Sequence, residues 1–187
     1  MRLKLIIIVL LFFLACNSSE KKVPDLLDCV PQNSLAAFQI NDQNMLGNAL
    51  TNNPFLIEII ALDSNLYDDI KNVVPSRFSS KSLLCFTPEG KSEMALSFIY
   101  EIEHLDSISK PIGKELNYNN IVITVSQKDE KKTYSAQING LRIISTSQLV
   151  LENSIRNIQN KKTGIQNHYF FNLAEISDGN SPMSILL

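Results

Sequence analysis

The chain has 187 residues, of which 44% are hydrophobic and 19% are charged, and its formal net charge is −2. This length and apolar content are typical of a folded domain with a buried core, and they exclude a chain that is mainly disordered. The mild acidity provides no basic surface for nucleic acid, so nucleic acid is not an expected partner.

The N-terminal residues have the pattern of an export signal. Arg2 and Lys4 supply positive charge, and the apolar run at residues 5–14 is too short to cross a hydrocarbon core of about 30 Å as a helix. The run leads into Ala15-Cys16, which is similar to the lipobox of bacterial lipoproteins. In that class the cysteine carries acyl chains such as palmitate and becomes the mature N-terminus. The pattern predicts a lipoprotein signal peptide at residues 1–15 and lipidation of Cys16; the alternative is an ordinary signal peptide with an incidental cysteine.

The remaining chain divides into a short tether and one main domain. Residues 17–22 are polar and lack apolar periodicity, so we expect a flexible tether at residues 16–24 that starts at the acylated cysteine. Residues 25–180 carry the helix and strand patterns of an α+β domain. Residues 181–187 are largely apolar and resemble the start of a second, truncated unit of a longer protein. The alternative is that they add an edge strand to the first domain.

The first half of this domain is predicted as one strand followed by three helices. Apolar residues alternate at residues 34–40, which is typical of a strand. Helical apolar stripes follow at residues 46–50, 54–60 and 66–73. Asn53 before Pro54 favours a helix that starts at that point.

Strands dominate the second half. Apolar alternation predicts five further strands, at residues 83–86, 94–102, 121–125, 134–138 and 141–144. Residues 104–114 are predicted as a connection or a short helix. Asn139-Gly140 predicts a type I′ turn, and Ser147 caps a helix with Leu151 and Ile155 on its apolar stripe. These elements predict an α+β fold, with an antiparallel sheet of about four to six strands and helices packed on one face.

Three cysteines are present, and Cys16 is assigned to the lipid. In an exported protein the other two, Cys29 and Cys85, are candidates for a disulfide. Both also lie among apolar residues, where a small hydrophobic side chain packs, so two buried free thiols are the equal alternative. No metal site is predicted, because the cysteines lack paired spacing and the chain has only 2 histidines.

The sequence contains no Gly-x-Ser-x-Gly elbow, no His-Glu-x-x-His, no phosphate loop and no dinucleotide fingerprint. We therefore predict no catalytic residue and no cofactor. His104 is expected at a solvated strand end, His168 beside aromatic residues of the core, and Asp68-Asp69 on a solvated helix face. Asp106-Ser107-Ile108 resembles the short acceptor sequence for O-glycosylation in exported proteins of the Bacteroidota, which makes Ser107 a candidate glycosylation site.

Four segments of the chain carry a resemblance to known proteins: the lipobox, the leader at residues 30–34, Asn53-Pro54-Phe55-Leu56 and Leu83-Leu84-Cys85-Phe86. With these segments the chain resembles the N-terminal part of uncharacterised cell-envelope lipoproteins of flavobacteria and other Bacteroidota. Those chains are generally longer, and their family has no established activity, so no residue role is carried over. The resemblance implies a lipid anchor in the cell envelope, at the outer membrane on its periplasmic or surface face.

We therefore expect a lipid-anchored, non-enzymatic binding or structural module that contacts the membrane through its lipid and meets protein or glycan partners. The alternative is an envelope hydrolase whose active site has no known motif or lies in a missing C-terminal part.

Overall fold

The computed structural model describes residues 25–62, 65–78, 81–91, 93–102, 113–128, 130–160, 172–173 and 183–186. The predicted signal peptide, the acylation site Cys16 and the tether up to residue 24 lie outside these residues, as do His104, Ser107 and His168. In the described part of the chain, none of the helices has the length and apolar character that crossing a membrane requires.

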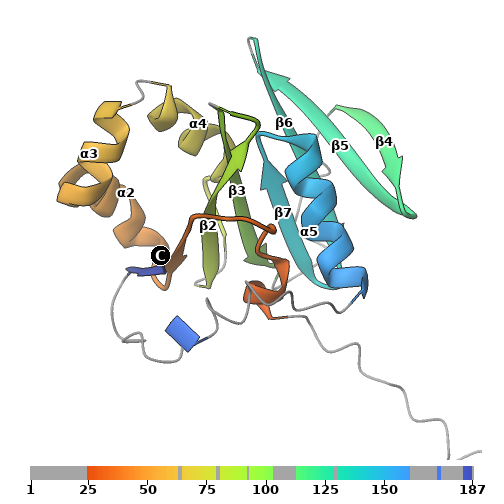
Figure 1. Ribbon diagram of the computed structural model, residues 1–187, viewed down its shortest axis with the longest axis horizontal. Helices are drawn as coiled ribbons and strands as arrows, with labels where there is room; N and C mark the ends of the chain where they lie inside the picture. Colours follow the sequence, from red (N-terminus) through yellow and green to blue (C-terminus); the bar gives the residue numbers. More distant parts are fainter. Residues whose placement is uncertain are drawn as a thin grey trace, which may run out of the picture.

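One antiparallel sheet of eight strands forms the centre of this α+β fold (Figure 1). The strands are β1 (Ala36–Ile40), β2 (Ser82–Glu89), β3 (Glu93–Glu101), β4 (Lys114–Tyr118), β5 (Ile121–Lys128), β6 (Lys131–Ile138), β7 (Leu141–Ser145) and β8 (Met183–Leu186). The helices are the 3₁₀-helix η1 (Leu26–Cys29) and the α-helices α2 (Gln43–Asn52), α3 (Pro54–Leu62), α4 (Leu66–Val73) and α5 (Gln148–Asn160). Across the sheet the order is β4-β5-β6-β7-β3-β2-β1-β8.

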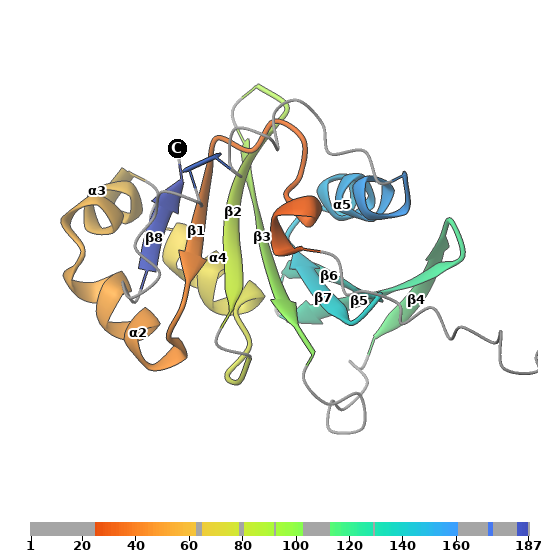
Figure 2. The ribbon, with the colours of Figure 1, turned by 90° about the horizontal axis from the view of Figure 1, so that it is seen from below.

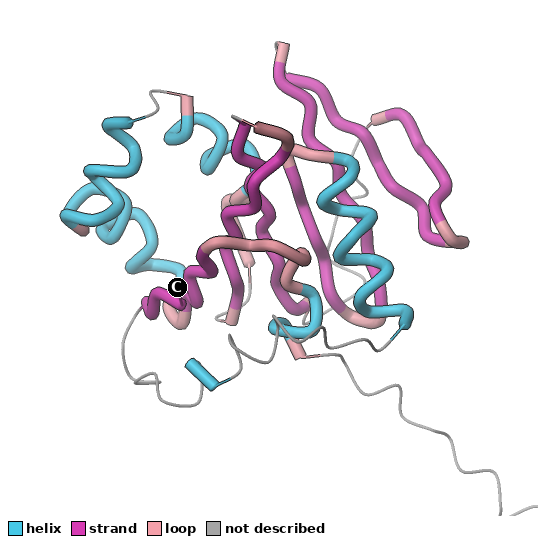
Figure 3. The backbone as a smooth tube through the Cα atoms, viewed as in Figure 1, coloured by secondary structure: helices cyan, strands magenta, loops and turns pink. Residues whose placement is uncertain are grey.

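The three predicted helices between the first two strands are confirmed, as α2, α3 and α4 (Figure 3). Asn53 caps α3 as expected, because its Oδ1 accepts a hydrogen bond from the backbone nitrogen of Leu56 at 3.2 Å. In α4 the predicted apolar stripe of Leu66, Ile70 and Val73 is buried. Local sequence signals therefore located this part of the chain correctly.

The predicted hairpin turn and the start of α5 are confirmed as well. Asn139 and Gly140 have φ values of 50° and 85°, which is the left-handed conformation that a type I′ turn requires at both central residues. The turn brings Ile138 of β6 opposite Leu141 of β7. At the start of α5, the Oγ of Ser147 accepts a hydrogen bond from the backbone nitrogen of Val150 at 3.3 Å.

Apolar side chains cover both faces of the central strands. On β2, Leu83 and Cys85 belong to one buried cluster, and Leu84 and Phe86 belong to another, because successive side chains of a strand point to opposite faces. We call these the α5 face, on which η1 and α5 pack, and the α4 face, on which α2, α3 and α4 pack. In Figure 2, α2, α3 and α4 gather around β8, β1 and β2, and η1 and α5 lie beside β3 and β7.

The prediction that helices pack on one face only is therefore wrong. Strands that are apolar on both sides must be covered on both sides, and the chain supplies helices before β2 for one face and after β7 for the other. A sheet covered on one face requires polar residues between the apolar ones of each strand. In β2 the intervening residues are equally apolar.

The sheet also has more strands than the predicted four to six, because β4 and β8 are added at its two edges. In β4 only Leu116 and Tyr118 pack against the core of the α5 face, so its apolar pattern is short. At the other edge β8 pairs with β1, and Leu186 is buried. The described part of the 181–187 segment, Met183–Leu186, is therefore an edge strand of this sheet.

Candidate functional site

A polar junction lies between α4 and the beginning of β6. Leu66, Ile70 and Val73 hold α4 on the α4 face, and Asp69 directly precedes Ile70 in the same helix. The Nζ of Lys131, the first residue of β6, donates a hydrogen bond to Oδ1 of Asp69 at 2.7 Å. This ion pair joins two elements that are far apart in the chain.

The junction contains a hollow of about 360 Å³, which we call the α4–β6 hollow. Every residue that lines it is polar or charged: Asn65, Asp69 and Asn72 on the α4 side, Lys131, Lys132 and Thr133 on β6, and Thr146 after β7. The Lys131 side chain is 39% exposed and that of Asp69 is 28% exposed, so both remain accessible to a ligand.

The wall at Thr146 is held by the backbone of β3. The backbone nitrogen of Leu96 donates to Oγ1 of Thr146 at 3.0 Å, and the backbone nitrogen of Thr146 donates to the carbonyl oxygen of Leu96 at 3.0 Å. The hollow is therefore built between a helix flank and a firmly paired part of the sheet, which reduces the ordering that a ligand must bring about on binding.

Chemically, the α4–β6 hollow offers hydrogen bonds from its polar groups and apolar contact from the stems of the same side chains. Its ammonium groups are donors, the Asp69 carboxylate is an acceptor, and the amides and hydroxyls supply both kinds of group. A hydroxyl-rich ligand can use neighbouring donors and acceptors such as those of Lys131 and Asp69. The lining contains one carboxylate and no histidine, and no group of three or more metal-binding side chains occurs among the residues that the structure describes.

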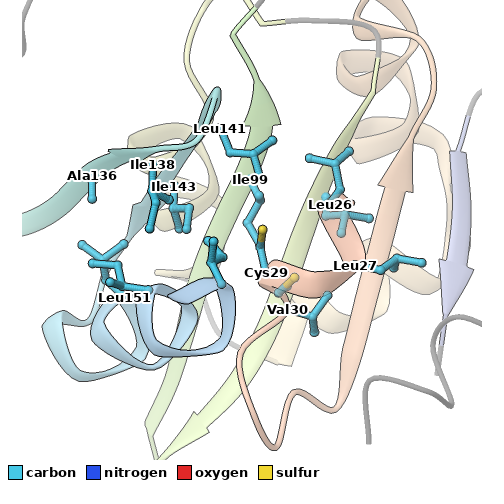
Figure 4. Packing of buried hydrophobic residues seen from close by; sticks show 14 of the residues in the cluster. Leu26, Leu27, Cys29, Val30, Ile99, Ala136, Ile138, Leu141, Ile143 and Leu151 are labelled. Carbon is cyan, nitrogen blue, oxygen red and sulfur yellow. The ribbon is translucent and has the colours of Figure 1, made fainter. Parts of the chain in front are cut away.

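The two predicted thiol positions lie away from this hollow. Cys29 and Cys85 are free, buried thiols, and both belong to the apolar core of the α5 face (Figure 4). Burial raises the pKa of the Cys85 thiol to about 12. Burial also raises the pKa of Cys29 well above its ordinary value, and a charge on Asp28 or on Cys85 would raise it further. Neither thiol is a reactive nucleophile in the folded chain.

The sequence placed Asp68-Asp69 on a solvated helix face, and this is only half right. Asp68 is exposed, whereas Asp69 is paired with Lys131. Residues 128–132 are a charged run between two predicted strands, typical of a loop, but Lys131 is the first residue of β6. No local sequence signal indicates that Asp69 and Lys131 form a pair. The only signal at Lys131 is its place in a run of charged residues before a strand.

Comparison with known proteins adds no relative. No protein-family model matches this chain, and neither a curated protein nor a solved structure matches it. Function is therefore inferred from the residues and the geometry of the chain itself.

Proposed function

We propose that this protein is exported, anchored in the bacterial cell envelope by acyl chains on Cys16, and binds a hydrophilic partner through its α+β domain. The observation that carries the proposal is the N-terminal pattern: basic residues, a short apolar run at residues 5–14, and a small residue before Cys16. Each buried CH₂ of an acyl chain contributes about 0.8 kcal/mol, so several chains hold a protein on a membrane durably.

The position of the folded domain along the chain agrees with such an anchor. The first described element, η1, starts at Leu26, and Asp25 caps it by accepting a hydrogen bond from the backbone nitrogen of Leu27 at 3.0 Å. Eight residues, 17–24, of which the first six are polar, separate this cap from Cys16. By its resemblance to flavobacterial lipoproteins, we assign the protein to the outer membrane, on its periplasmic or surface face.

The α4–β6 hollow supports the binding part of the proposal. Each residue of its lining carries a hydrogen-bonding group, and a ligand that buries such a group without pairing it loses about 1–3 kcal/mol. A glycan presents hydroxyls that can donate and accept at the same position. We therefore propose a glycan of the envelope or cell surface as the ligand of this hollow.

The anchor is tested by membrane fractionation with protease treatment of intact cells, in which the native chain is compared with Cys16→Ala. We expect the native chain in the membrane fraction and the variant in the soluble fraction. Cys29→Ala is the matched control, because it removes a cysteine that is not at the lipobox, and it should remain in the membrane fraction. If the native chain and Cys16→Ala divide equally between the membrane and soluble fractions, the lipid anchor is contradicted, whatever the protease treatment shows.

The ligand is tested by the binding of the full-length protein, in detergent, to an array of immobilised glycans. Asp69→Asn and Lys131→Met should each reduce the binding of any captured glycan by tenfold or more, which corresponds to about 1.4 kcal/mol. Lys91→Met is the control, since Lys91 is an exposed cation in the turn between β2 and β3. If Asp69→Asn and Lys131→Met both bind the captured glycan as well as the native chain does, the glycan binds to another surface and the hollow is rejected as its site.

A further inference from the structure

Cys29 and Cys85 meet in the core of the α5 face. Cys29 is the last residue of η1, and Cys85 lies in β2 between Ala37 of β1 and Ser97 of β3. Both cysteines are completely buried, at 0% exposure, and they are members of the same apolar cluster. Because η1 packs directly on β2 and β3, the two cysteines lie on elements that are in contact.

Two further observations support this proximity. Figure 4 shows Cys29 among the apolar side chains of the cluster, and Cys29 and Cys85 are its only sulfur-containing members in the described part of the chain. The charge of an ionised Cys85 would also raise the pKa of Cys29, and such an interaction weakens with distance. The cluster thus brings together two thiols that the sequence places far apart.

We propose that Cys29 and Cys85 form an intramolecular disulfide when the exported chain folds, and that this bond joins η1 to β2. The inference rests on the export in the proposed function, because structural disulfides persist in compartments outside the reducing cytosol. The free thiols of the structure are then the reduced form of the same pair.

The bond forms by exchange with a small disulfide, for which oxidised glutathione is the probe. The thiolate of one cysteine attacks a sulfur of oxidised glutathione and releases one glutathione thiolate, which leaves a mixed disulfide. The second cysteine then attacks the protein sulfur of that mixed disulfide and releases the second glutathione. Two protein thiols are oxidised, one disulfide is reduced to two thiols, and both protons end on glutathione.

Burial determines when this exchange takes place. In the folded chain the raised thiol pKa values make the attacking thiolate rare, and packing closes the approach of an oxidant. The bond must therefore form before η1 packs on β2. A folded, reduced chain should react with oxidised glutathione far more slowly than an unfolded one.

The disulfide has a mechanical consequence at an anchored domain. η1 is the first described element after the tether, so a pull on the lipid reaches η1 before the sheet. A bond to Cys85 passes that pull to β2, which is paired with β1 on one side and β3 on the other. Without the bond, η1 is held only by noncovalent contacts.

The experiment uses the full chain isolated from cells in detergent, which is reduced and unfolded in guanidinium and refolded with oxidised and reduced glutathione. Free thiols are then alkylated in guanidinium without reduction, and the digested protein is analysed by mass spectrometry. We expect one peptide pair, linked through Cys29 and Cys85, whose mass is that of the two peptides minus two hydrogens. Cys85→Ala is the control, and its Cys29 should be alkylated or carry glutathione.

If the refolded native chain has both cysteines alkylated, or glutathione on each, the proposal is overturned. The same mapping on protein taken directly from cells, with alkylation at lysis, separates this inference from the proposed export. A linked pair after refolding together with alkylated thiols in the cell places the domain in a reducing compartment. That result contradicts export and also overturns the disulfide as a feature of the native protein.

Discussion

The hydroxyl of Ser97 on β3 donates a hydrogen bond to the hydroxyl of Ser145 on β7, with 2.9 Å between the two oxygens. Both residues are fully buried, and they lie directly opposite each other in the β3–β7 pair at the middle of the sheet. The Ser145 hydroxyl in turn donates to the carbonyl oxygen of Leu96 at 2.9 Å and accepts from the backbone nitrogen of Ser147 at 3.2 Å. This network joins the two halves of the sheet to the start of α5.

Ser145→Ala should lower the free energy of unfolding by about 1–3 kcal/mol, because it leaves the buried donors of Ser97 and Ser147 without an acceptor. Guanidinium denaturation measures the change. Ser154→Ala is the matched control: Ser154 is equally buried, but its hydroxyl has no hydrogen-bond partner among the residues that the structure describes, so its removal should be neutral or stabilising. Equal losses in the two variants would show that the hydrogen bonds of Ser145 contribute nothing to stability.

The Asp69–Lys131 ion pair should contribute little to stability. Both side chains are partly exposed, and ion pairs of this kind typically contribute about 0.2–1 kcal/mol. A double-mutant cycle with Asp69→Asn and Lys131→Met, measured by urea denaturation, should give a coupling energy below about 1 kcal/mol that decreases as salt is added. A coupling energy of several kcal/mol would show that the pair stabilises the fold, and it would weaken the assignment of the pair to ligand binding.

Two glycines should respond oppositely to alanine. A Cβ added at Gly113 would overlap the carbonyl oxygen of Val125, whereas a Cβ at Gly47 has no heavy atom within 4 Å. Gly113→Ala should therefore displace β4 from β5 and destabilise the fold by about 1–3 kcal/mol. Gly47→Ala, on the exposed side of α2, should stabilise by about 0.5–1 kcal/mol. The measurements are the unfolding midpoint of each variant and the hydrogen-exchange rates of the β4 and β5 amides. The exchange rates should increase in Gly113→Ala only.

Alkaline pH should destabilise the reduced protein through its buried thiols. The pKa of Cys85 is raised from 9.0 to about 12 in the folded state, so between these values the unfolded chain loses the thiol proton while the folded chain retains it. The unfolded state then binds fewer protons, and stability falls as pH rises. From pH 8 to pH 10 the Cys85 thiol should account for a loss of about 1 kcal/mol.

The measurement is urea denaturation at both pH values with a reducing agent present, and the difference is compared with that of Cys85→Ala. The variant should lose less stability between the two pH values, since its other titrating groups are the same. A native chain and a variant with identical pH dependence would contradict the assigned burial of the thiol. The oxidised protein should also lack this thiol contribution, because a disulfide has no proton to release.

Much of the order of helices and strands could be predicted from the sequence, because periodicity and capping are local. The Pro54 helix start, the apolar stripe of α4 and the Asn139-Gly140 turn depend only on neighbouring residues. β4 was missed because only Leu116 and Tyr118 of its five residues pack on the core. The signal peptide and the acylation of Cys16 remain predictions.

The candidate site could not be predicted in the same way. Asp69 and Lys131 were each seen as ordinary solvated charges, and their pairing requires the fold of the whole intervening chain to bring α4 beside β6. The sequence left two alternatives for Cys29 and Cys85, and only the packing of η1 on β2 shows that both belong to one cluster.

The sequence by itself determined most of the helices, strands and turns, and where an export signal is expected, because these depend on residue spacing over a few positions. Only the tertiary structure decided that β7 lies beside β3, that β8 closes the edge beside β1, and that helices cover both faces. Strand order depends on contacts between residues distant in sequence, and many pairings satisfy the same alternation of apolar side chains. Among these pairings, the observed one is selected by how completely it fills the apolar cores of the α5 face and the α4 face.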